Sequence, residues 1–153
     1  MRLKVNGKLI WSIFWALVGV FIVIVCLFFI PPFRDLLAGS ELFLLPFAVF
    51  FLLGITLIVL TLKEKVGGML KKFFLLAGAS SAGVFVSILL HGAVYALFIY
   101  FFGEGFWNGG DEPVFFIMAI IVCPLGFLVG AVGSIVLAIK NFRLAKESPS
   151  SPQ

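Results

Sequence analysis

His91 is the only histidine in the chain, and it lies inside a long stretch without charged residues. An ionisable side chain in such a stretch is expensive to bury and is a functional hypothesis by default. Ser87 and Tyr95 lie four residues to either side, so on a helix the three side chains share one stripe. The stripe could line a path for a polar solute. Alternatively, His91 is neutral, bonds to Ser87, Tyr95 or a neighbouring carbonyl, and serves packing alone.

Three carboxylates follow in the segment 103–113, namely Glu104, Asp111 and Glu112. Such oxygens suit a hard cation, but their spacing matches no EF-hand loop. We therefore expect a solvated acidic loop and no metal site. No Asp or Glu lies inside the uncharged stretches, which weakens a reading as a proton-coupled exporter or ion pump.

Cys26 and Cys123 both lie in apolar runs and form no CxxC pair, so we expect inert packing. A single histidine excludes bis-histidine haem ligation within one chain, and nothing specific supports His91 with Met118 as an axial pair. The sequence contains no phosphate-binding loop, HExxH pattern or serine elbow. We predict no catalytic residues, no cofactor and no enzymatic activity.

The elements that must position these residues follow from the composition. The chain is 63% hydrophobic and 12% charged, whereas soluble domains are nearer half apolar and a quarter charged. A small soluble domain cannot hide so much apolar surface, so the solvent must be lipid. The basic residues flank apolar runs and form no stripe with exposed aromatics, which argues against a nucleic-acid partner.

Four uncharged runs are long enough to cross a hydrocarbon core of about 30 Å. Because lipid offers the backbone no hydrogen-bond partners, each run must be a helix, and the fold class is all-α. The predicted spans form one domain over residues 1–140 and are 9–30, 42–62, 73–102 and 114–139. The tail 141–153 ends rich in Ser and Pro and is predicted to be disordered.

Three details refine the spans. Pro46 falls in the first turns of its run, where a missing amide donor is tolerated, whereas Pro124 should kink the fourth helix and free the carbonyl of Ile120. The third run is longer than a perpendicular span needs, so we expect tilt or a projecting last turn. The first run is too long for an ordinary signal peptide and is followed by Pro31-Pro32, which favours an uncleaved helix.

Orientation follows from the positive-inside rule. The N-terminus, the linker between the second and third spans, and the tail hold ten of the eleven Lys and Arg residues, and only Arg34 lies on the other side. The sequence therefore predicts an antiparallel bundle in the cytoplasmic membrane with both termini in the cytoplasm. His91 then lies near the outer boundary, about 28 Å beyond Lys72 at 1.5 Å per residue.

Small residues recur along two of the predicted helices and let helix backbones approach closely. They are predicted either to pack helices within one chain or to form an interface between copies of it. The residues are Gly126, Gly130, Ser134 and Ala138 in the fourth span, and Gly78, Ala82 and Gly83 in the third.

The stretches 65–72, 91–95, and 111–113 leading into 123–127 resemble an uncharacterised family of small prokaryotic four-helix integral membrane proteins. The resemblance implies no activity or catalytic residues. We predict a non-enzymatic accessory or scaffold subunit that contacts the lipid bilayer and either self-associates or binds a membrane-protein partner. The alternatives are a small channel or facilitator for a neutral or weakly polar solute and, least supported, a membrane enzyme or haem subunit.

Overall fold

The computed structural model describes residues 3–32, 41–64, 66–108 and 110–147. Every element in these ranges is helical, and four of the helices are long and apolar enough to cross a membrane. In chain order the elements are α1 (Leu3–Phe29), η1 (Glu41–Leu44), α3 (Leu45–Lys63), α4 (Gly68–Phe102), α5 (Pro113–Ile117), the π-helical turn η2 (Met118–Val122) and α6 (Cys123–Glu147). The prediction of four apolar helices is confirmed.

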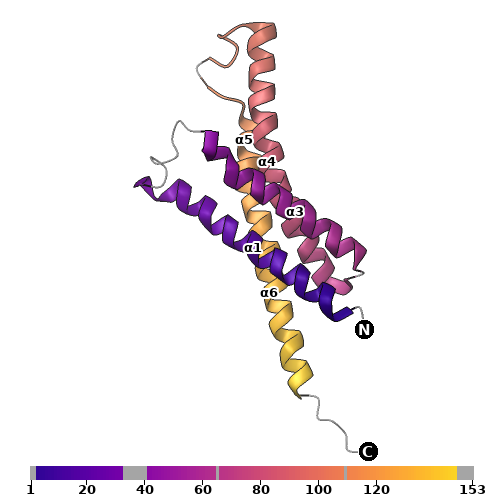
Figure 1. Cartoon of the computed structure of the whole chain (residues 1–153). Helices are drawn as coiled ribbons and strands as arrows, with labels where there is room; N and C mark the ends of the chain where they lie inside the picture. Colours follow the sequence, from indigo (N-terminus) through magenta and orange to yellow (C-terminus); the bar gives the residue numbers. More distant parts are fainter. Residues whose placement is uncertain (1–2, 33–40, 65, 109, 148–153) are drawn as a thin grey trace, which may run out of the picture.

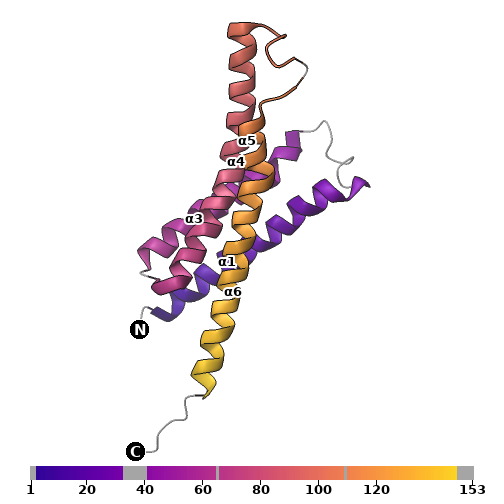
Figure 2. The ribbon, with the colours of Figure 1, turned by 180° about the vertical axis from the view of Figure 1, so that it is seen from behind.

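The helices form two layers that cross at an incline. The pair α1 and α3 lies against the longer pair made by α4 and the continuous α5–η2–α6 segment (Figures 1 and 2). The longer pair extends beyond α1 and α3 at both ends, because the last turns of α4 rise above them and the last turns of α6 descend below them. Helix α4 begins at Gly68, before the apolar run that starts at residue 73, and therefore includes Lys71 and Lys72.

Helix ends coincide with residues that suit them. Pro46 lies in the first turn of α3, where no intrahelical donor is lost. Gly103 ends α4 with a φ of 84°, a conformation that only glycine adopts without strain, and its N–H donates to the carbonyl of Ile99. The last helix runs through Glu147, into the segment 141–153 that the sequence assigned to the tail, and residues 148–153 lie outside the described ranges.

Pro124 is accommodated by the π-helical turn directly before it. In this turn the N–H of Cys123 donates to the carbonyl of Met118, five residues earlier. The wider turn relieves the collision between a proline ring and the carbonyl four residues before it, so the chain continues as one helix. The disturbance expected at Pro124 therefore takes the form of a π-bulge.

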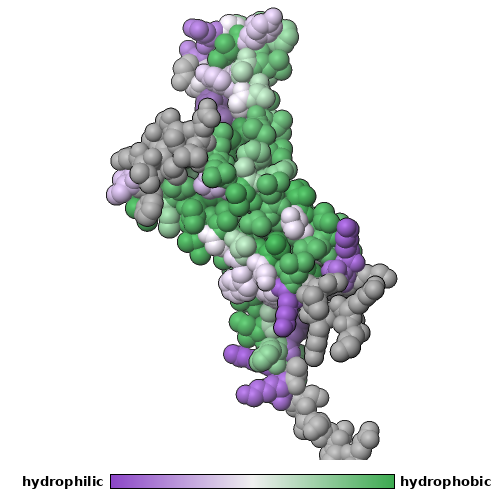
Figure 3. Space-filling view, in the orientation of Figure 1, coloured by the Kyte–Doolittle hydropathy of each residue, from purple (hydrophilic) through white to green (hydrophobic). Residues whose placement is uncertain are grey.

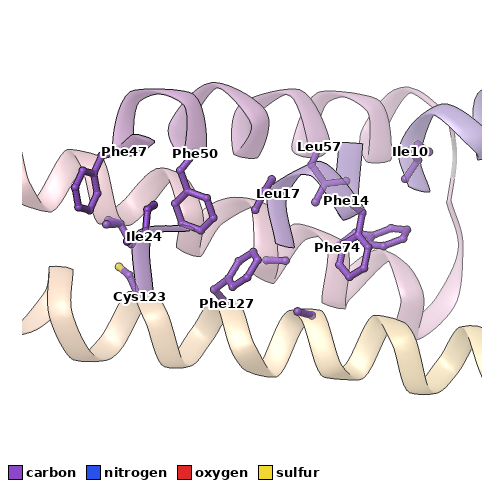
Figure 4. Close-up of a cluster of buried hydrophobic side chains, with 13 residues drawn as sticks. Ile10, Phe14, Leu17, Ile24, Phe47, Phe50, Leu57, Phe74, Cys123 and Phe127 are labelled. Carbon is purple, nitrogen blue, oxygen red and sulfur yellow. The ribbon is translucent and has the colours of Figure 1, made fainter. Parts of the chain in front are cut away.

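Aromatic rings from three helices meet in the core of the bundle, and Figure 4 shows two of them, Phe50 and Phe127. Phe127 of α6 lies 4.6 Å from Phe21 of α1 and 5.1 Å from Phe50 of α3, measured between ring centroids. Phe50 and Phe127 are almost completely buried. Toward the start of α1, Phe14 packs on Phe74 of α4 in the same way, at 5.4 Å. Such ring pairs hold α1 against the other helices, and each contributes about 0.5–1.5 kcal/mol beyond its buried area.

Small residues bring α4 close to α6 and α3. A Cβ atom on Gly130 would lie 2.7 Å from the backbone nitrogen of Ala77, and one on Gly78 would lie 2.9 Å from the carbonyl oxygen of Gly54. Contacts this short leave no room for any side chain larger than hydrogen. These two glycines therefore face other helices of their own chain.

The surface of the bundle carries a continuous apolar belt. Hydrophobic side chains cover the middle of the molecule in the view of Figure 3, and hydrophilic ones gather at its two ends. Large apolar residues within the belt are open to the surroundings, among them Ile22, Leu52, Leu89 and Val129. A surface of this kind suits a hydrocarbon environment and not water.

Candidate functional site

His91 lies on α4 and faces the segment that leads into α5. Its Nδ1 atom lies 3.1 Å from the backbone carbonyl oxygen of Glu112 and 3.3 Å from Glu112 Oε2, and its Nε2 atom lies 3.3 Å from Asp111 Oδ2. Only acceptors face the two nitrogens. A hydrogen bond to one of these oxygens requires a proton on the imidazole nitrogen that faces it.

Glu112 is the N-cap of α5, directly before Pro113. Its Oε1 accepts from the N–H of Val114 at 2.7 Å and its Oε2 from the N–H of Phe115 at 2.9 Å. Pro113 favours this start because its fixed φ suits the first helical position and its missing donor is not needed there. The carboxylate therefore satisfies two of the free amides at the helix start.

Glu112 is buried, with only 3% of its surface exposed, so the expectation of a solvated acidic loop is wrong for this residue. Burial raises the pKa of the Glu112 carboxyl, but the N–H groups of Phe115 and Val114 and the nearby His91 favour its charged form. These opposing effects leave the pKa of Glu112 below its ordinary value of 4.5. The residue is therefore a carboxylate at neutral pH.

Asp111 completes the cluster from the solvent side. Its Oδ1 accepts from the N–H of Glu112 at 2.8 Å, which leaves Oδ2 toward His91, and its side chain is 57% exposed. Two carboxylates thus surround one imidazole. The group holds the end of the loop against α4, 21 residues away along the chain.

The predicted stripe of Ser87, His91 and Tyr95 faces the segment that follows α4. Ser87 is buried, while Tyr95 stacks on Trp107 at 6.0 Å between ring centroids. The packing interpretation offered Ser87, Tyr95 or a neighbouring carbonyl as the partner of His91. The contact of Nδ1 with the carbonyl oxygen of Glu112 fits the third of these, and neither Ser87 nor Tyr95 is a partner in the described contacts. Sequence spacing identified the stripe but not the residues opposite it.

The small-residue rows occupy the contacts between helices. Gly126 lies against Ser80, Gly83 against Cys123, and Gly78 against Ile58. Ser134 is fully buried, and its hydroxyl donates to the carbonyl of Gly130 at 2.8 Å. Ala82 is buried on α4, while Ala138 lies on α6 and is partly exposed.

An apolar cavity of about 420 Å³ lies beside the His91 cluster. It is enclosed by the second half of α1, by η1 and the first half of α3, by the middle of α4, and by the π-bulge. Among the described residues that line it, His91 alone has a polar side chain. The lining residues Phe28, Phe29, Phe116 and Ile120 are also exposed at the surface, so the cavity opens sideways through the apolar belt.

The cavity volume is within the range of small-molecule pockets, which have apolar walls and a few polar groups that orient a ligand. Both cysteines are free thiols, and no group of three or more metal-binding side chains is found in the part of the chain that the structure describes. The arrangement favours binding of a largely apolar molecule with a polar end. Comparison of the chain with protein-family models, with curated proteins and with solved structures finds no match.

Proposed function

We propose that this protein is a non-enzymatic accessory or scaffold protein of the cytoplasmic membrane that takes a hydrocarbon chain from the bilayer into its lateral cavity. The observation that carries the proposal is the cavity itself, whose walls are apolar apart from His91 and whose lining residues Phe29 and Phe116 are also exposed at the surface. Walls of this kind give water few hydrogen-bond partners but make dispersion contacts with methylene groups. The cavity therefore favours a hydrocarbon chain over water.

The proposal includes an antiparallel arrangement with both termini in the cytoplasm. The direction in which α4 and α6 pair supports it. Gly130 lies against Ala77, whereas Gly126, which comes earlier in α6, lies against Ser80, which comes later in α4. The charge distribution supports it as well, because Lys63, Lys71 and Lys72 lie together at the junction of α3 and α4, away from the acidic loop. A reporter fused after Glu147 should be active only inside the cell, and one inserted after Asn108 only outside. Activity of both on one side would refute the arrangement.

The facilitator alternative is less well supported by the described residues. A path for a polar solute needs polar walls, but Ser80 and Ser81 are buried between packed helices and the wall of the cavity is apolar apart from His91. A partner subunit or second copy of the chain fits the accessory role. Because Gly126 and Gly130 already face α4, such a partner would have to use other faces of the bundle.

The cavity is tested by photolabelling in proteoliposomes with a phospholipid that carries a diazirine in one acyl chain. Labelling should concentrate on the peptides around Phe28, Ile88 and Ile120. Ala119→Trp places an indole in the cavity and should lower this labelling severalfold, whereas Val132→Trp on an exposed face of α6 should not. Even labelling of all exposed helix faces, unchanged by Ala119→Trp, would refute the proposal.

A further inference from the structure

We propose that the occupant of the cavity is a phospholipid with an ethanolamine headgroup, held with one acyl chain in the cavity and its headgroup against His91 and Asp111. This inference rests on the proposed function and adds the identity of the headgroup. The assignment of the headgroup is based on three neighbouring features, which are the apolar cavity, the imidazole of His91 at its end and the exposed carboxylate of Asp111 beside that imidazole. Chain, phosphate and ammonium follow one another in the same order in such a lipid.

His91 is where the apolar cavity ends. Its ring lines the cavity, its side chain is 23% exposed, and it lies 5.7 Å from the ring of Phe116. The distance of 3.3 Å from Nε2 to Asp111 is longer than the 2.7–2.9 Å of a strong charge-assisted hydrogen bond. A phosphate oxygen at the end of the chain region can therefore accept from Nε2 in exchange for this long contact.

Asp111 is the carboxylate that can bind an ammonium group. Its Oδ1 is used by the N–H of Glu112, while its Oδ2 side is exposed and becomes free when a phosphate binds His91. Glu112 is unsuitable, because its side chain is 4% exposed and both of its oxygens cap α5. A primary ammonium has N–H donors for Oδ2, whereas the quaternary ammonium of choline has none.

The charge around the cluster argues against an anionic headgroup. Two carboxylates accompany one imidazole, and neither the segment 103–113 nor the described lining of the cavity contains a Lys or Arg. A glycerol headgroup would carry an uncompensated phosphate charge toward these carboxylates. An ethanolamine headgroup supplies its own cation at the position of Asp111, so its charges alternate with those of the cluster.

The experiment compares three diazirine phospholipids that have identical chains and ethanolamine, choline or glycerol headgroups, each in nanodiscs with the full chain. We expect the ethanolamine lipid to label the cavity peptides about two- to fivefold more than the others, the effect of one half-exposed ion pair. Asp111→Asn, which keeps an acceptor for the N–H of Glu112, should equalise the ethanolamine and choline lipids. Glu104→Gln, which changes an exposed carboxylate of the same loop, should leave the preference intact.

A charge-reversal variant distinguishes a change of headgroup preference from a general loss of lipid binding. Asp111→Lys should transfer the preference to the glycerol lipid, because the cluster then offers a cation to the phosphate. Equal labelling by all three lipids in the unmodified protein, or an ethanolamine preference that survives Asp111→Asn, would overturn the headgroup assignment and leave the cavity proposal standing. Absence of labelling at the cavity with every lipid would overturn both.

Discussion

Gly130→Ala tests a close backbone approach between α4 and α6. The added Cβ would lie 2.7 Å from the nitrogen of Ala77, 2.9 Å from the carbonyl oxygen of Phe73 and 3.0 Å from the Cα of Ala77. All three atoms belong to the backbone of α4, so no side-chain rotation relieves the contact. The two helices must separate by several tenths of an ångström along their whole interface.

The expected effect is a loss of stability of about 1–3 kcal/mol, the usual cost of overfilling a packed contact. Alanine is a better helix former than glycine by about 0.5–1 kcal/mol, which offsets part of the loss. Gly19→Ala supplies the matched control, because Gly19 lies on an exposed face of α1 with no heavy atom within 4 Å of the added methyl. The difference between the two variants therefore isolates the contact.

The assay is unfolding of the purified protein in mixed micelles with increasing amounts of SDS, followed by helical circular dichroism. Gly130→Ala should unfold at a clearly lower SDS fraction than the unmodified protein, and Gly19→Ala at the same fraction or a higher one. Gly133→Ala should be intermediate, since the three atoms nearest to its methyl would belong to the ring of Phe73, which can rotate. Equal midpoints for Gly130→Ala and Gly19→Ala would refute the close packing of α4 on α6.

Two further predictions concern the His91 cluster. The pKa of Glu112 is lowered in the folded protein, so its stabilising effect is present above pH 4.5 and is lost as pH falls through the lowered value. At pH values below 4.5 the unmodified protein should therefore unfold at a lower SDS fraction, and Glu112→Gln should show a smaller decrease. Parallel pH curves for the two proteins would contradict this. His91→Ala removes the contacts to Asp111 and Glu112, so a glutamate-specific protease should cut the loop at Glu104 severalfold faster than in the unmodified protein, whereas an unchanged cleavage rate would show that these contacts do not hold the loop.

The sequence predicted the number and approximate ranges of the apolar helices because hydrocarbon leaves the backbone no alternative to internal hydrogen bonds. It placed helix ends less well, because hydropathy marks the part of a helix that suits lipid and not the whole helix. Lys71 and Lys72 interrupt the apolar run but not the helix, which begins at Gly68. In the same way α6 runs past Lys140, since charged residues are good helix formers outside the hydrocarbon.

The partners of His91 could not be read from spacing along one helix. Periodicity relates residues of the same element, such as Ser87 and Tyr95, but the groups that face the imidazole come from the end of the following loop. One local signal was available: Pro113 is typical of a first helical position, so Glu112 directly before it lies where a side-chain oxygen can cap free amides. A capping carboxylate must lie at the base of its helix. Because the segment 103–112 returns the chain to α4, that base lies beside α4, and His91 is the only His, Lys, Arg, Asp or Glu in α4 after Lys72.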